Sequence, residues 1–343
     1  MSVDALRAPR DPAHAEPLLH IENLCVTFET GRGRVRAVEG LTLDVGRGEA
    51  VAIVGESGSG KSVSMKAVLG LLKHDPAVSI SGVLQFDGQD LLAVPDRQYR
   101  EMRGAQIALI SQDALSGLNP TLTIGYQVAE PLIVHRRWSR RRAMARAREL
   151  LDLVGIPAAG ERLADFPHQL SGGMRQRALI AVSLALEPDL LIADEPTTAL
   201  DVTIQDQILR LLDDLRRRLD MTLVLITHDM GVVARVADAV VVMYSGSAVE
   251  SGRAREVFKS PRHPYTEALL QAVPRSDRLG ERLHAIRGNP PNPAAPPSGC
   301  RFHPRCDYAR TECAGVPTPL VLSAPGHATA CPFWRENHAA ADD

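Results

Sequence analysis

The chain has 343 residues, of which 45% are hydrophobic and 23% are charged, with a formal net charge of -2. This length suits one large domain or two modest ones with a sizeable core, and the composition is that of an ordinary globular protein. The near-neutral charge gives no support for an overall nucleic-acid-binding surface. No apolar run approaches the ~20 residues needed to span a bilayer. Residues 1–16 lack an apolar signal core, so we expect a disordered leader on a cytosolic protein.

The first half of the chain predicts strands of two kinds. Apolar residues partly alternate over residues 18–28, as in a half-buried strand, whereas residues 49–54 (EAVAIV) form a continuous apolar strand. The second strand runs into a glycine-rich loop, and residues 61–72 continue as a helix. Residues 83–88, which end in Asp-Gly, indicate a hairpin of an antiparallel sheet. Another short strand is predicted at residues 107–111 (IALIS).

The second half alternates between helical and strand patterns. Residues from about 125 to 185 are mostly helical, with apolar positions three and four apart. The basic stretch 136–148 in this region could bind nucleic-acid phosphates, but a solvated helix face is the favoured interpretation. Further on, a helical pattern at 204–219 separates short apolar runs at 190–193, 222–226 and 239–243. This alternation predicts an α/β fold with a mostly parallel sheet and helices on its faces.

The loop GESGSGKS at residues 55–62 has the pattern of a phosphate-binding loop. Glycines let successive backbone N–H groups converge on a phosphate at a helix N-terminus, and those that provide this freedom here are Gly55, Gly58 and Gly60. Lys61 would reach the β- and γ-phosphates of a nucleotide. The Ser62 hydroxyl would bind Mg²⁺.

An acidic pair follows the apolar strand LLIA. Asp194 is expected to hold Mg²⁺ through water, and Glu195 is expected to accept a proton from the attacking water or to orient it. A solvated strand end explains either acid alone. It does not readily explain the pair followed by Pro196 and Thr197, so a hydrolytic site is favoured.

The segment LSGGMRQR at residues 170–177 lies between the phosphate loop and the acidic pair. In this order the motifs resemble the ATP-binding subunit of ATP-binding-cassette (ABC) transporters. The resemblance implies a RecA-like core, an antiparallel β-subdomain and an inserted helical subdomain at about 115–185. Ser171 can cap a helix while Gly172 and Gly173 expose N–H groups. An ordinary capped helix is the alternative, but the resemblance implies that this segment grips the γ-phosphate held by a second ATPase subunit.

The same resemblance assigns further residues. Gln112 would contact Mg²⁺ and water, His228 would contact the γ-phosphate, and Asp201 would cross between the two subunits. Phe28 is the best candidate to stack on adenine. The other positions implied in nucleotide binding are Glu56, Ser57, Ser59 and Val63. The expected catalytic set is Glu195, His228, Gln112 and Lys61, and the expected Mg²⁺ set is Ser62, Gln112 and Asp194.

The cassette pattern covers residues 17–260, and residues 261–343 are expected to form an extension. Its segments HPYTEALL at 263–270 and CRFHPRCDYAR at 300–310 resemble the C-terminal region of oligopeptide and dipeptide importer ATPases. That family implies a related ATPase partner, two membrane permeases, an extracytoplasmic peptide-binding protein and a place at the cytoplasmic face of the inner membrane. Nickel importers share this architecture and are the second candidate. A non-transport ABC ATPase is less favoured.

Four of the five cysteines lie in the extension: Cys300, Cys306, Cys313 and Cys331. Disulfides are disfavoured in a reducing cytosol, and four thiolates suit zinc or an iron–sulfur cluster. The short C-x-x-C pairs usual in structural zinc sites are missing. The family resemblance implies a four-iron four-sulfur cluster, which is favoured over zinc and over unligated thiols. His303 and His327 are taken as non-ligands, and Cys25 as a core residue.

Overall fold

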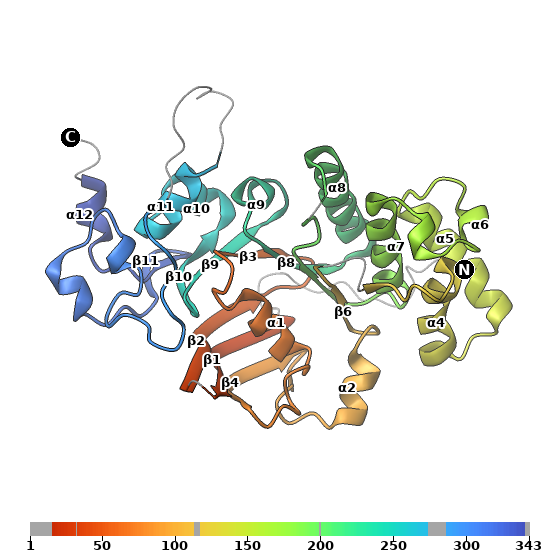
Figure 1. The fold of residues 1–343 in the computed structure, drawn as a ribbon, viewed down its shortest axis with the longest axis horizontal. Coiled ribbons are helices and arrows are strands. Elements are labelled where there is room, and N and C mark those ends of the chain that lie inside the picture. The colour runs from red at the N-terminus through yellow and green to blue at the C-terminus, as the bar shows by residue number, and fades with distance from the viewer. Residues whose placement is uncertain (1–15, 32, 113–116, 199, 274–285, 340–343) are drawn as a thin grey trace.

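The computed structural model describes residues 16–31, 33–112, 117–198, 200–273 and 286–339. Apart from Glu16, the predicted leader lies outside these residues. Two sheets organise the described chain (Figure 1). One has eight strands in the order β11-β12-β10-β9-β3-β8-β7-β6, and the other has four in the order β2-β1-β4-β5.

The parallel part of the large sheet confirms the predicted strands. Its members are β3 (Ala50–Val54), β6 (Ile107–Ile110), β7 (Leu190–Asp194), β8 (Thr222–Thr227) and β9 (Ala239–Tyr244). All pairs among them are parallel. Their side chains are almost entirely buried, because helices lie against both faces of the sheet, and this accounts for the continuous apolar runs in the sequence.

The smaller sheet is antiparallel and lies below the large sheet in Figure 1. It consists of β1 (Leu19–Thr30), β2 (Gly33–Val45), β4 (Val78–Phe86) and β5 (Gln89–Asp90). Asp87 and Gly88 both have positive φ, 49° and 75°, in the turn between β4 and β5, so the predicted hairpin is confirmed. The sequence analysis missed β2, whose first half carries the exposed Arg34 and Arg36, although residues 41–45 alternate between buried apolar and exposed polar positions.

Several helices surround these sheets. The bounds are α1 (Lys61–Val68), α2 (Asp96–Met102), α8 (Val202–Leu219), α9 (Met230–Val236), α10 (Ala254–Lys259), α11 (Pro264–Gln271) and α12 (Trp334–Ala339). Helix α1 is shorter than predicted, since Gly70 just beyond it has φ 62°. An added Cβ at Gly70 would meet the Tyr99 ring at 2.7 Å, so this turn requires glycine.

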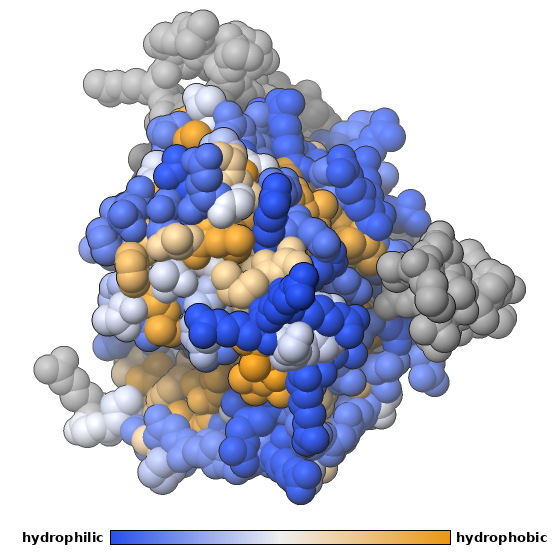
Figure 2. All heavy atoms as spheres, turned by 90° about the vertical axis from the view of Figure 1, so that its right-hand side faces the viewer, coloured by the Kyte–Doolittle hydropathy of each residue, from blue (hydrophilic) through white to orange (hydrophobic). Residues whose placement is uncertain are grey.

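The inserted helical region is confirmed. It holds α4 (Ile124–Arg136), α5 (Arg140–Leu153), α6 (Ala159–Arg162) and α7 (Gly172–Leu184). Helix α5 buries Ala143 and Ala147, while Arg146 forms ion pairs with Glu149 and Glu187. The basic stretch therefore lies largely on an exposed helix face. Figure 2 shows this end of the molecule covered largely by hydrophilic side chains.

The C-terminal extension adds strands to the large sheet. Strand β10 (Ser247–Arg253) pairs with β12 (His327–Thr329), which pairs with β11 (Val321–Ala324). Glu250 of β10 is fully buried and contacts His327 Nε2 at 2.7 Å. The extension and the cassette thus share one sheet, at the left in Figure 1.

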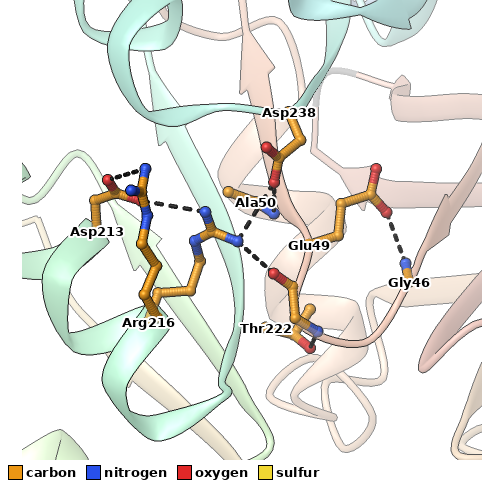
Figure 3. Close-up of polar contacts among 9 residues, drawn as sticks. Gly46, Glu49, Ala50, Asp213, Arg216, Thr222 and Asp238 are labelled. Carbon is orange, nitrogen blue, oxygen red and sulfur yellow. Dashed lines mark hydrogen bonds and ion pairs between the residues drawn. The ribbon is translucent and has the colours of Figure 1, made fainter. Parts of the chain in front are cut away.

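A polar network links the amino-terminal ends of strands β3 and β9, at the end of the parallel sheet that is remote from the phosphate loop (Figure 3). Arg216 of α8 donates to the Gly48 carbonyl and lies 3.2 Å from Asp213 and 3.4 Å from Asp238. The Asp238 carboxylate in turn accepts from the Ala50 N–H at 2.9 Å. One guanidinium therefore joins a helix to the starts of two parallel strands.

Candidate nucleotide site

The loop after β3 has the backbone that a phosphate cradle requires. Gly55, Gly58 and Gly60 have φ values of 150°, 80° and 101°. A Cβ at Gly55 would lie 2.1 Å from the Met243 carbonyl oxygen, and one at Gly60 would lie 2.4 Å from that of Ala37. Conformation therefore favours glycine at all three positions, and close packing also requires it at Gly55 and Gly60. Helix α1 begins immediately afterwards, so its free N–H groups face the loop.

Lys61 is the first residue of α1, and its side chain folds back over the loop. Its Nζ donates to the carbonyl oxygens of Gly55 at 2.7 Å and Glu56 at 3.0 Å. Burial lowers the pKa of Lys61, while the nearby carboxylates of Glu195 and Asp194 act to raise it. The ammonium is thus held at the loop by weak neutral acceptors that an incoming phosphate can replace.

The two residues expected to serve Mg²⁺ lie in direct contact. The Ser62 hydroxyl donates to Asp194 Oδ1 at 2.8 Å, although the residues are 132 positions apart. Burial raises the pKa of Asp194, and the hydrogen bond from Ser62 opposes that shift. A hydroxyl and a carboxylate side by side at the loop are hard oxygen donors of the kind that Mg²⁺ prefers.

The Glu195 carboxylate is the meeting point of three loops that follow parallel strands. Gln112 Nε2 donates to its Oε2 at 3.1 Å, the Thr198 hydroxyl donates to the same oxygen at 2.9 Å, and His228 Nδ1 lies 3.4 Å from Oε1. Glu195 itself has φ 47°, a rare conformation for glutamate. The structure thus brings together the residues predicted for catalysis. Thr198 was not singled out, because only the fold shows its contact.

Other predicted residues lie outside this cluster. Ser171 caps α7 by accepting from the Met174 N–H at 3.3 Å, and Gly172 is exposed. Asp201 caps α8 by accepting from the Ile204 N–H at 3.0 Å. Phe28 pairs with Val35 in the small sheet, near the strand that packs on Gly60.

The four cysteines of the extension line one small, mostly apolar pocket of about 20 Å³. Burial raises the pKa of Cys306 to about 12 and of Cys331 to about 11, and it also raises the pKa of Cys300. Across the described residues, no group of three or more His, Cys, Asp or Glu side chains is arranged to hold a metal ion. The four cysteines therefore line the same pocket without forming a metal-binding arrangement among the described residues.

Comparison with known proteins decides the family. A family model described as ABC transporter matches residues 38–198, and one described as oligopeptide/dipeptide transporter, C-terminal region, matches residues 249–313. The dipeptide transport ATP-binding protein DppD of Bacillus subtilis is 47% identical over 95% of this chain and 96% of its own. The chain is an ATP-binding subunit of the oligopeptide/dipeptide ABC transporter family.

Other relatives of this ABC subunit agree. The oligopeptide transport ATP-binding protein OppD of Salmonella typhimurium is 46% identical over 94% of this chain and 96% of its own. A dimeric structure of the ATP-binding cassette MJ0796, in a post-hydrolysis state bound to ADP and Pi, aligns with a TM-score of 0.62 at 29% identity. That match covers 69% of this chain and 99% of MJ0796. Family membership identifies this subunit as an ATPase. None of its described helices is long and apolar enough to cross a membrane.

Proposed function

We propose that this subunit hydrolyses ATP to power the uptake of short peptides through partner permeases. The observation that best supports this function is that Gln112, Thr198 and His228 all lie against the Glu195 carboxylate. This carboxylate stands beside a phosphate loop over which the Lys61 side chain is folded. The peptide cargo is supported by the named functions of the relatives and by the match of the C-terminal region.

Each residue has a proposed role. Lys61 binds the β- and γ-phosphates, and the loop N–H groups from Glu56 to Val63 cradle them. Ser62 and Asp194 hold Mg²⁺, with Gln112 nearby, and this ion neutralises charge on the phosphates when bound. Glu195 orients the attacking water and takes up its proton, while Gln112 and Thr198 fix the carboxylate. His228 contacts the γ-phosphate, and Phe28 stacks on adenine.

Residues 170–177, here called the signature segment, are proposed to act across a subunit interface. Ser171, Gly172 and Gly173 would bind the nucleotide held by a second, related ATPase subunit, and Asp201 would reach towards that subunit. The exposure of Gly172 and the dimeric state of the similar cassette MJ0796 support this arrangement. Two permeases would hold the pair at the cytoplasmic face of the inner membrane, with an extracytoplasmic peptide-binding protein delivering cargo. No nucleic acid takes part.

The proposed domains follow the motifs. Residues 17–260 form the cassette, and residues 261–343 form the extension that carries the cysteines.

We retain the proposal that four cysteines of the extension bind a four-iron four-sulfur cluster, with zinc as the alternative. These cysteines are Cys300, Cys306, Cys313 and Cys331. The proposal is supported by the four cysteines lining one small apolar pocket, because four thiolates are the usual ligand set of such a cluster. Anaerobic purification with iron, sulfide and zinc analysis tests this. Stoichiometric zinc without sulfide would defeat the cluster, and the absence of both would leave free thiols.

The cargo is tested in a strain that lacks the gene for this subunit. Uptake of labelled di- and oligopeptides and of ⁶³Ni²⁺ is compared after complementation with the wild-type chain or with Lys61→Ala. Restored peptide uptake by the wild type alone supports the proposal. Restored nickel uptake without peptide uptake would establish the nickel alternative, and restoration of neither would indicate a non-transport role.

A further inference from the structure

We propose that Arg305 of the cysteine-bearing extension is a positioning residue for the phosphate loop. Through Glu56, it couples the extension to nucleotide binding. The inference rests on the nucleotide site proposed above and is independent of the peptide cargo. It concerns a contact between residues 249 positions apart.

Glu56 directly follows Gly55 in the phosphate loop, and the extension holds both its side chain and its backbone. Arg305 Nη1 and Nη2 donate to the two Glu56 carboxylate oxygens at 2.6 and 2.9 Å, the bidentate geometry typical of strong arginine–carboxylate pairs. The Glu56 N–H donates to Tyr265 Oη at 2.8 Å. Tyr265 belongs to α11, the helix with which the extension begins.

The anchoring side chains are themselves fixed. The Arg305 side chain is only 6% exposed, against 27% for that of Glu56. Its Nε donates to the Arg287 carbonyl at 2.8 Å, and its Nη1 also donates to Tyr244 Oη at 3.2 Å. The rings of Tyr244 and Tyr265 lie 4.6 Å apart in one aromatic cluster. The guanidinium therefore offers Glu56 a rigid partner.

Glu56 also contacts the phosphate-binding lysine directly. Lys61 Nζ donates to the Glu56 carbonyl at 3.0 Å, so Glu56 lies between Arg305 and the Lys61 ammonium. Its carboxylate is also one of the charges that act on the pKa of Lys61. An unpaired carboxylate here would attract Lys61 and repel a triphosphate. The Arg305 pair cancels that charge and fixes the loop.

A second arginine of the same segment reaches the other wall of the site. Arg301 donates to the Ser245 carbonyl and to Glu39 of β2, and the neighbouring Gly246 N–H donates to the Ser59 carbonyl of the loop at 3.0 Å. The short segment 300–306, with a cysteine at each end, therefore contacts the surroundings of the loop twice. A change in the conformation of the cysteine pocket would move both arginines.

The test measures equilibrium binding of trinitrophenyl-ATP with Mg²⁺ to the full-length chain, and KM and kcat for ATP in the assembled transporter. We expect Arg305→Met to weaken binding and to raise KM about tenfold, because a half-buried charge pair is lost. The kcat at saturating ATP should change less than threefold. Arg305→Lys, which keeps the charge without the bidentate fork, should recover part of the affinity.

A double-mutant cycle isolates the contact. Because Glu56→Gln removes the repelling charge, adding Arg305→Met to it should cost at most about threefold in affinity. An equal loss in the wild-type and Glu56→Gln backgrounds would overturn the proposal. Arg310→Met removes an exposed arginine of the same extension, paired with Glu336, and should leave binding unchanged. If Arg305→Met does not fold, Tyr265→Phe tests the backbone anchor with the loss of one oxygen, and unchanged binding there would also count against the proposal.

A failure of the nucleotide site itself would look different. Lys61→Ala should abolish Mg²⁺-dependent binding in every background. If Lys61→Ala binds normally, the site assignment is wrong. If Lys61→Ala loses binding while Arg305→Met and Tyr265→Phe retain it, only the coupling to the extension is wrong.

Discussion

Gln112 Nε2 donates to Glu195 Oε2 across 3.1 Å, although the two residues follow different strands and are 83 positions apart. The contact orients a carboxylate that stands beside the phosphate loop. Because β6 and β7 are parallel neighbours, their carboxyl ends deliver both side chains to the same edge of the sheet. The proposed role of Glu195 depends on this arrangement.

Glu195→Gln should slow ATP hydrolysis at least ~100-fold, because an amide cannot accept the proton of the attacking water. Binding of Mg²⁺-ATP should remain, since Lys61 and the loop are unchanged. Single-turnover hydrolysis in the assembled transporter measures the effect. Glu187→Gln, at an exposed glutamate paired with Arg146, should behave as wild type. Near-normal turnover of Glu195→Gln would remove this residue from the mechanism.

Gly172→Asp should reduce hydrolysis in the assembled transporter more than ~10-fold by placing a negative charge against the partner's γ-phosphate. The substitution is tolerable in the fold, since a Cβ there lies 3.5 Å from Leu200 Cδ2. Gly173 is less suitable, because its Cβ would lie 2.9 Å from Ile204. Nucleotide binding to the isolated chain should not change.

The matched control for Gly172→Asp is Gly172→Asn, which has the same shape without the charge and should reduce hydrolysis far less. If the two variants lose activity equally, the effect is steric. If neither loses activity, the signature segment does not bind a partner's nucleotide.

Acidification should destabilise the protein through His263. Burial lowers the pKa of His263 to about 4 from its ordinary value of 6.5, and its Nδ1 accepts from the Tyr265 N–H at 3.1 Å. The unfolded chain therefore takes up this proton at a higher pH than the folded chain. The contribution of neutral His263 to the free energy of unfolding is fully present above pH ~6.5 and is lost as the pH falls towards 4. The limiting slope of this loss is about 1.4 kcal/mol per pH unit.

Denaturant unfolding between pH 7 and pH 4.5 measures this dependence. The comparison is made with His263→Asn, which can still cap α11 but has no imidazole. The variant should show a smaller loss of stability on acidification. An identical pH profile in the two proteins would assign the effect to other groups.

Arg216→Met should lower the free energy of unfolding by about 1–3 kcal/mol, because it leaves the Gly48 carbonyl and the Asp213 carboxylate without their buried donor. Arg218, on the same helix, forms an exposed pair with Asp214, and Arg218→Met should change stability by less than about 0.5 kcal/mol. Urea unfolding of both variants makes the comparison. Equal effects would show that the network in Figure 3 adds nothing beyond a surface ion pair.

Much of the site could be predicted from the sequence because its parts are local. The loop from Gly55 to Ser62 carries its own glycines and lysine, Asp194 and Glu195 end an apolar strand, and Ser171 caps its own helix. Each motif needs only neighbours along the chain to adopt its shape. Alternating strand and helix patterns likewise determined the parallel sheet, since buried strands require apolar residues on both faces.

The tertiary structure alone decided which distant residues meet. No local pattern marks the pairing of β12 with β10, or the contacts of Thr198 with Glu195 and of Arg305 with Glu56. These contacts depend on loop closure over long stretches of chain and on packing that excludes water. The sequence around an arginine does not show whether its side chain is solvated or buried. The sequence by itself therefore determined the chemistry of the nucleotide site. The fold decided that the cysteine-bearing extension would hold the phosphate loop.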